Sequence, residues 1–268
     1  MDTPHFDSAT IGPVGCLHLV FFGLIIPVAV VRSAGKMNTR PFPLRQKYFT
    51  SVLIQQLMLT AFSLMAARLE WIELFREIQR PAWSALAAAG FLALSLSFMF
   101  PRWKRNVIKR ERKAYLHMPR TRREKGLWLG ISAAAGFGEE VTYRGVMFIL
   151  LIRLFGNAWM AALVAALIFA ISHATQGRRS VGVIFVIALA FHGLVFVSGS
   201  LVTAMAVHFI YDVAAGFSYG YLGEKLGYPM DPMPPVVEAA RADEARPAST
   251  KTEQTSPTSP SDQARSEG

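Results

Sequence analysis

The stretch LWLGISAAAGFGEEVTYRGVMFILLI, residues 127–152, places two adjacent carboxylates and an arginine inside an otherwise apolar run. A run of this kind is long enough for a helix that crosses a membrane, which needs about 20 apolar residues. An ionised side chain at the centre of a bilayer costs roughly 2.5–3.5 kcal/mol on insertion scales. Glu139, Glu140 and Arg144 therefore need partners or water, and groups in such places usually serve a function.

Apolar residues form long blocks through most of the chain, which has 268 residues and is 52% hydrophobic. Blocks of this length are typical of a membrane protein. We expect an all-α fold, a polytopic membrane bundle of about seven transmembrane helices, with an eighth span or a re-entrant segment as the main alternative. The predicted spans are residues 14–31, 50–67, 82–100, 126–152, 158–174, 181–197 and 201–222.

The composition divides the chain into three parts. Residues 1–125 hold the first three predicted spans and a basic loop, and residues 126–222 hold the spans with buried ionisable groups. The third part, residues 223–268, becomes rich in Pro, Ser, Thr and charge from Asp231 onward. Such a segment cannot bury enough apolar surface to offset the entropy of ordering, so we expect a disordered cytoplasmic tail.

The net charge of +10 is unevenly placed, because residues 101–125 hold eleven Lys and Arg against two Glu. A basic protein often binds nucleic acid, but this segment directly follows a predicted span. It is better interpreted as a cytoplasmic segment facing anionic lipid, either a basic amphipathic helix or a solvated loop. No nucleic-acid partner is expected. The positive-inside rule places the N-terminus outside and the C-terminus in the cytoplasm of a multi-pass cell-membrane protein, for which the composition favours a bacterial inner membrane.

The spacing of the three ionisable groups separates their roles. Glu140 and Arg144 are four residues apart, so on a helix they share a face and can pair. Glu139 points roughly 100° away by helical geometry. Arg144 can therefore neutralise Glu140 and leave Glu139 free for chemistry, although a purely structural ion pair between helices remains the alternative interpretation.

Two later spans also carry polar groups one helical turn from their neighbours. FAISH, residues 169–173, ends in His173, and HFIYD, residues 208–212, contains His208 and Asp212. Because such groups need partners inside a membrane, we expect the three helices to meet around one wet polar pocket. His18 and His192 have no acidic residue one turn away, and we interpret them as packing residues.

The expected pocket suits two kinds of chemistry. A carboxylate beside a neutral imidazole can deprotonate a water molecule, and a second imidazole fixed by a carboxylate can donate to a developing oxyanion. These groups suit amide hydrolysis without a Ser or Cys nucleophile. Alternatively, His173, His208 and Glu139 could supply three zinc ligands and leave the fourth position to water.

Three motifs in this order resemble the CAAX-protease and bacteriocin-processing family of intramembrane proteases, also called CPBP or ABI, which includes the Ras-converting enzymes. The motifs are EEVTYR at 139–144, followed by Gly145, then FAISH at 169–173 and HFIYD at 208–212. The resemblance covers about residues 126–222. The first three predicted spans carry no motif of this family.

The resemblance implies a role for each motif residue. Glu139 and His173 would activate water, His208 and Asp212 would form the oxyanion site, and Glu140 and Arg144 would support them. It implies a glutamate-type endopeptidase with no cofactor, a peptide or membrane-protein substrate and the lipid bilayer as surroundings. Asp212 stands where the prenyl-protein proteases usually have Asn, which leaves the substrate class open.

Two other functions are compatible with these residues. The first is a non-catalytic membrane immunity or scaffold protein of the same fold, but such a protein would be expected to lack some of the motif residues. The second is an ion-coupled transporter, which usually has broken helices or an internal repeat. The sequence shows no repeat, and all the motif residues are present. These observations favour the protease.

Overall fold

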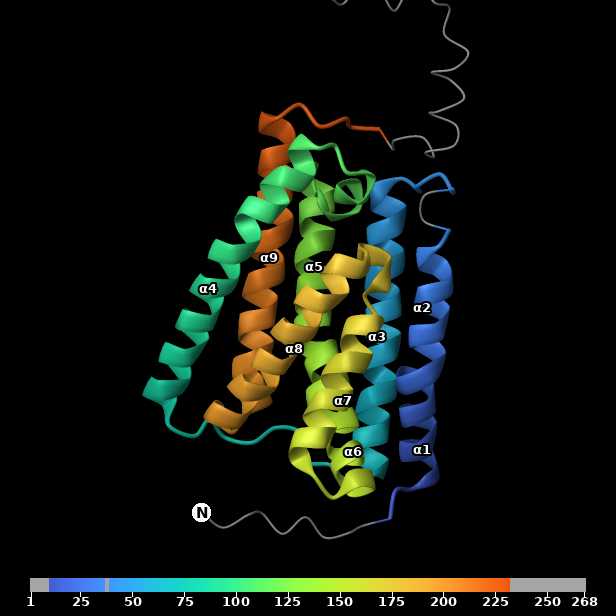
Figure 1. Cartoon of the computed structure of the whole chain (residues 1–268), viewed down its shortest axis with the longest axis vertical. Helices are drawn as coiled ribbons and strands as arrows, with labels where there is room; N and C mark the ends of the chain where they lie inside the picture. The colour runs from blue at the N-terminus through green and yellow to red at the C-terminus, as the bar shows by residue number, and fades with distance from the viewer. Residues whose placement is uncertain (1–9, 37–38, 232–268) are drawn as a thin grey trace, which may run out of the picture.

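The computed structural model describes residues 10–36 and 39–231, and this part of the chain is built from helices alone (Figure 1). The first half contains α1 (Pro13–Val20), η1 (Phe21–Ile25), α2 (Ile26–Ala34), α3 (Arg45–Leu69), α4 (Pro81–Ile108) and η2 (Arg112–His117). The second half contains α5 (Arg122–Glu139), η3 (Glu140–Met147), α6 (Phe148–Phe155), α7 (Ala158–Ile171), η4 (Ala174–Gln176), α8 (Arg178–Ser198) and α9 (Leu201–Lys225). Two of the short segments, η1 and η3, are π-helical, whereas η2 and η4 are 3₁₀ turns.

The expected all-α membrane bundle is confirmed. Among the described residues, five helical stretches are long and apolar enough to cross a membrane, namely Pro13–Ala34, Arg45–Leu69, Pro81–Ile108, Arg178–Ser198 and Leu201–Lys225. The predicted span at 158–174 is occupied by the shorter apolar helix Ala158–Ile171. The predicted span at 126–152 is one continuous helical run through α5, η3 and α6. The number seven is thus not confirmed, although every predicted span is helical.

Helix α5 stands inside the bundle, between α3 on one side and α9 on the other (Figure 1). Helix α4 is tilted and packs on α9 and α8, while α6, α7 and α8 follow one another as packed neighbours. The chain enters α1 at one end of the bundle and leaves α9 at the opposite end (Figure 1). This arrangement surrounds the charged end of α5 with helices on several sides.

Small residues allow α5 to lie close to both neighbours. A Cβ atom on Gly138 would overlap the hydroxyl of Thr60 on α3, and one on Gly136 would lie 2.9 Å from the backbone nitrogen of Phe209 on α9. Close approach through small residues is a common way to pack helices in membranes, where apolar burial between helices gives little driving force. Gly136 and Gly138 therefore allow α5 to lie close to both α9 and α3.

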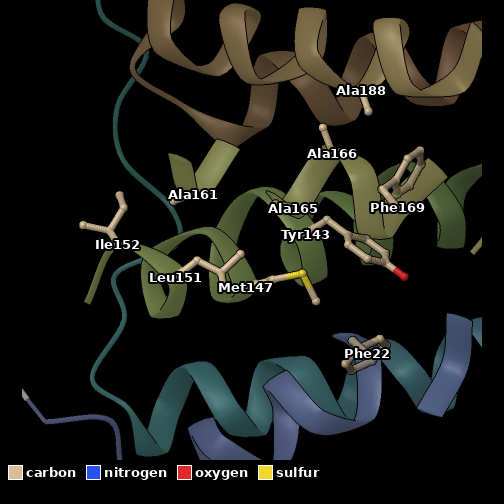
Figure 2. Close-up of a cluster of buried hydrophobic side chains, with 10 residues drawn as sticks. All are labelled: Phe22, Tyr143, Met147, Leu151, Ile152, Ala161, Ala165, Ala166, Phe169 and Ala188. Atoms are coloured by element: carbon tan, nitrogen blue, oxygen red, sulfur yellow. The ribbon is translucent and has the colours of Figure 1, made fainter. Parts of the chain in front are cut away.

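The largest apolar cluster packs against the second half of the charged helix (Figure 2). Tyr143 lies at its centre, with its ring edge-on to Phe169 of α7 at 5.0 Å and to Phe22 of η1 at 6.1 Å. Helix α7 presents the short side chains of Ala161, Ala165 and Ala166 to this cluster, as Figure 2 shows. The cluster fixes the position of the segment that follows Glu139.

The basic segment 101–125 is neither a single amphipathic helix nor a solvated loop. Helix α4 continues to Ile108, Arg110 has a positive φ of 50° where the chain turns, and η2 follows before α5 begins. Tyr115 and Met118 of this segment are 2% and 0% exposed. Aromatic and apolar residues among the cations explain the difference, because they form one buried cluster with residues of α4 and α9.

The end of the bundle extends past the predicted boundary at residue 222. Helix α9 runs to Lys225, and Tyr228 is buried with its hydroxyl donating to the carbonyl of Glu111 at 3.0 Å. The carbonyl of Met230 accepts a hydrogen bond from Arg45 at 3.0 Å. The rest of the predicted disordered tail, residues 232–268, lies outside the described residues.

Candidate active site

The predicted catalytic residues line one cavity of about 1610 Å³ within the bundle. Glu139 comes from the end of α5, His173 follows α7, and His208 and Asp212 come from α9. Residues of α2, α3, α4, η2 and α8 also contribute to the walls. Motifs that are up to about 70 residues apart in the chain thus meet at one place, as their ionisable groups led us to expect.

Glu139 lies between the two imidazoles. Its Oε2 atom is 3.8 Å from Nε2 of His208 and 4.0 Å from Nε2 of His173. Its Oε1 atom accepts a hydrogen bond of 2.6 Å from the side-chain amide of Gln56 on α3. The carboxylate is 17% exposed, so it is sheltered but open to the cavity. One oxygen is held by Gln56, and the other faces the two imidazoles.

His173 is oriented by the backbone of its own turn. Its Nδ1 atom lies 2.8 Å from the carbonyl oxygen of Phe169, which can only accept a hydrogen bond. The neutral imidazole therefore carries its proton on Nδ1 and presents the lone pair of Nε2 toward Glu139. The Phe169 ring packs against the imidazole at 4.5 Å between centroids. This contact and the hydrogen bond explain the Phe-x-x-x-His spacing.

Glu140 joins two motifs, because its Oε1 atom accepts from two donors. Arg144 Nη1 lies 3.1 Å away, which is the pair that the spacing predicts. His208 Nδ1 lies 2.8 Å away, a contact that the sequence does not indicate. Asp212, which the spacing places beside His208, has Oδ2 at 3.6 Å from Nε2 of that imidazole. Glu140 therefore orients His208, and Asp212 faces its other nitrogen.

Arg144 is almost fully enclosed, with 1% of its side chain exposed. Its guanidinium carbon lies 4.4 Å from the ring centroid of Phe169 and 5.2 Å from that of Phe191. Aromatic faces attract a cation when it is desolvated, and here they add to the ion pair with Glu140. The ion pair on η3 is thereby packed against aromatic side chains of α7 and α8.

The helix changes geometry at the site, because η3 spans Glu140–Met147 as a π-helix. Its turns are wider than those of an α-helix, and π-helical turns are frequent at functional sites. Every residue of η3 is buried. No sequence pattern used above distinguishes this geometry from an ordinary α-helix.

Gln56 and His117 are cavity residues that the sequence analysis did not identify. The signal for Gln56 was available, since two adjacent glutamines in an apolar span also need partners in a membrane. His117 lies on η2, and its ring packs against Trp128 and Tyr219 at 6.3 and 5.9 Å. Burial lowers the pKa of the His117 imidazole below its usual range, against the opposing hydrogen bond to Lys113.

The zinc alternative requires ligand atoms about 2.0–2.2 Å from one metal position. Within residues 10–36 and 39–231, no group of three or more His, Cys, Asp or Glu side chains is arranged to hold a metal ion.

The comparison with family models bears directly on these motifs. Residues 123–214 match the family Rce1-like, described as type II CAAX prenyl endopeptidase Rce1-like. This region of the chain is Rce1-like. The match confirms the resemblance found in the sequence and includes all three motifs, from Glu139 to Asp212. No curated protein and no solved structure matches the chain. The Rce1-like region covers about a third of the chain, and α3 and α4 lie outside it.

Proposed function

We propose that this protein is an intramembrane endopeptidase that hydrolyses peptide bonds of membrane-associated or leader-type peptides. The observation that carries the proposal is the position of Glu139 Oε2, 3.8 and 4.0 Å from the Nε2 atoms of His208 and His173 on the wall of one cavity. The Rce1-like match supports the same reaction class.

Glu139 and His173 are suited to activate water. A water molecule that hydrogen-bonds to both Oε2 and Nε2, at about 2.8 Å from each, fits between atoms separated by 4.0 Å. The carboxylate takes a proton from this water as the oxygen attacks the carbonyl carbon of the substrate. His173 holds the water in line, because its Nδ1 proton is already engaged with Phe169.

His208 is suited to stabilise the negative oxygen that forms on the substrate. As an imidazolium it donates from Nδ1 to Glu140 and presents the Nε2 proton to the cavity, where an oxyanion can accept it. Asp212, 3.6 Å from the same nitrogen, favours the charged imidazole. Loss of one such donor typically lowers kcat by about 10²–10³.

The reaction closes without a covalent intermediate. When the tetrahedral species collapses, the carbon–nitrogen bond breaks and the proton held by Glu139 passes to the leaving amine. The products are a new carboxyl terminus and a new amino terminus, and Glu139 returns to its carboxylate form. Water is the only co-reactant, so no metal or redox partner is needed for the atoms to balance.

The substrate is a peptide or membrane protein that reaches the cavity from the bilayer or its cytoplasmic surface. This orientation, with the N-terminus outside and the C-terminus in the cytoplasm, rests on the positive-inside rule, and a bacterial inner membrane is the proposed location. Candidate substrates are leader peptides and membrane-anchored sorting substrates. Nucleic acid is not a proposed partner.

A comparison of peptides from three cell populations tests this function. Cells that lack the protein are complemented with wild type, with Glu139→Gln or with Glu77→Gln, whose side chain is exposed between α3 and α4. We expect a set of membrane or secreted peptides to be processed only with wild type and Glu77→Gln. Equal processing with Glu139→Gln, at equal protein levels, would contradict the protease and favour the immunity or scaffold role.

A further inference from the structure

Helix α3 carries a polar stripe although it lies outside the Rce1-like region. Gln56, Thr60 and Ser63 are spaced four and three residues apart, so they lie on one face of the helix. Polar side chains in an apolar span need partners, because no water is available in the bilayer core. The face that they form is turned toward α5, the neighbour against which α3 packs.

Thr60 and Ser63 determine how α3 is placed against α5 and η3. Ser63 exchanges a hydrogen bond of 2.8 Å with Thr142 of η3. Thr60 occupies the space left by the missing side chain of Gly138. Two contacts therefore set the register between the helices without any contribution from Gln56. Because Gln56 lies one turn before Thr60, this register places it next to Glu139, the residue after Gly138.

Gln56 contacts the free carboxylate directly. Its Nε2 atom lies 2.6 Å from Oε1 of Glu139, and an ionised carboxylate can only accept. The amide nitrogen must therefore point at the acid. A hydrogen bond to a charged group is stronger and more directional than a neutral one. Oε1 is thus occupied, and Oε2 is the oxygen that remains for His173 and His208.

We propose that Gln56 is a positioning residue for the reaction, holding the Glu139 carboxylate so that only Oε2 faces the attacking water. This inference rests on the proposed protease function and extends it to a helix that the family model does not cover. A carboxylate without the amide rotates about its side-chain torsions, and both oxygens then sample the cavity. Small errors in the placement of a catalytic group reduce rates steeply.

A change at Gln56 should affect catalysis without affecting folding, because the contacts of Thr60 and Ser63 with α5 and η3 do not involve Gln56. Two variants remove the donor at the required position. Gln56→Leu has a similar volume and no donor, and Gln56→Asn keeps an amide that is one methylene too short. Gln46→Leu is the matched control, since Gln46 is a partly buried glutamine of the same helix that lies outside the cavity lining and makes no side-chain hydrogen bond to the described part of the chain.

The purified variants are assayed in liposomes on a peptide that the wild type cleaves. We expect kcat to fall about 10–100-fold in both Gln56 variants, with KM changed by less than about twofold. The melting temperature should match that of Gln46→Leu, which should retain wild-type kcat. A role in packing alone would lower the melting temperature and leave the kcat of the folded fraction unchanged.

Gln56→Glu should show a pH dependence of kcat that a loss of packing would not produce. The introduced carboxyl group can donate to Glu139 only while it is protonated, and two adjacent carboxylates share a proton as the pH falls. The kcat of this variant, relative to wild type at the same pH, should therefore recover as the pH is lowered. Gln56→Leu has no proton to regain, and its relative kcat should not recover.

Three results would overturn the inference. Wild-type kcat in both Gln56→Leu and Gln56→Asn would show that the amide is not needed to place the acid. A loss confined to KM would assign Gln56 to substrate binding. A relative kcat of Gln56→Glu that does not change with pH would remove the hydrogen bond as the cause. Absence of cleavage by the wild type itself would instead refute the proposed function, and the inference with it.

Discussion

The Nδ1 atom of His208 lies 2.8 Å from Oε1 of Glu140, so one hydrogen bond connects the first and last motifs at the centre of the bundle. The same oxygen accepts from Arg144 at 3.1 Å. The acid that the spacing assigns to structural support therefore also determines how the second imidazole points. A carboxylate shared between a guanidinium and an imidazole therefore orients both side chains.

This relationship predicts that Glu140→Gln impairs catalysis although its shape is preserved. The amide oxygen can still accept from His208, but the negative charge that favours the imidazolium is lost. We expect kcat to fall about 100-fold, comparable to the loss of an oxyanion donor. The measurement is steady-state cleavage by folded protein in liposomes, with Glu224→Gln, an exposed acid on α9, as the control. Unchanged kcat in Glu140→Gln would show that the charge is not used.

Arg144 is predicted to act mainly on stability. Arg144→Met removes the charge from a side chain that is 1% exposed and leaves His208 as the remaining partner of Glu140. Removal of one member of a buried pair costs about 3–5 kcal/mol. We expect a lower melting temperature and a reduced yield of folded protein in detergent.

The double variant Glu140→Gln/Arg144→Met provides the check on this prediction. Because it removes both charges together, it should be more stable than Arg144→Met alone. Coupling between residues in contact is measured by such a cycle. Additive losses in the two single variants and the double variant would show that the pair does not carry the stability.

The sequence predicted the helices well, because long apolar runs and their charged interruptions both have direct physical causes. Residues 126–152 are helical throughout, as expected. Whether each predicted span crosses the bilayer depends on tilt and length, which composition does not determine. The apolar run that begins at Ala158 shows this, because its helix ends at Ile171 and is shorter than a full span.

The meeting of the motifs could be predicted from the cost of isolated polar groups in lipid, but their partners could not. An i,i+4 rule finds pairs within one helix, such as Glu140 and Arg144. It cannot find contacts between helices, such as His208 with Glu140 or Gln56 with Glu139. These depend on the register between helices, which glycines at 136 and 138 and the π-helical turn determine.

Chelation is predicted to leave cleavage intact. The proposed reaction uses Glu139 and His173 to activate water, and within the described segments no three ligand-type side chains are arranged around one metal position. Purified protein treated with a strong chelator should retain the activity of untreated protein, and elemental analysis should find much less than one zinc per chain. Loss of activity that returns when zinc is added would contradict this prediction and restore the metal alternative.

The membrane orientation can be tested by labelling single cysteines. In a Cys16→Ser background, Glu77→Cys lies between α3 and α4, and Arg123→Cys lies at the start of α5, with both positions exposed. The positive-inside rule predicts that a membrane-impermeant maleimide labels Glu77→Cys in intact cells. Arg123→Cys should be labelled only after the cells are permeabilised. The opposite pattern would invert the topology and place the basic end of the bundle outside.

Asp212 should tolerate replacement by Asn better than replacement by Ala. Its Oδ2 atom lies 3.6 Å from Nε2 of His208, and 27% of its side chain is exposed to the cavity. Asn keeps an acceptor oxygen at this place and adds an amide donor that an oxyanion can use. Ala offers neither, so we expect kcat to fall about 100-fold in Asp212→Ala and less than about tenfold in Asp212→Asn.

The expected difference between the two Asp212 variants arises because Glu140 and Asp212 contact different nitrogens of His208. Glu140 holds Nδ1, so the ring should keep its orientation in either Asp212 variant, and only the surroundings of Nε2 change. The measurement is kcat for both variants on one defined peptide, with Asp231→Asn, an exposed acid beyond α9, as the control. If Asp212→Asn is as inactive as Asp212→Ala, the carboxylate itself is required. Asp212 would then carry a proton or bind a metal, and the oxyanion site would have to be assigned to His208 alone.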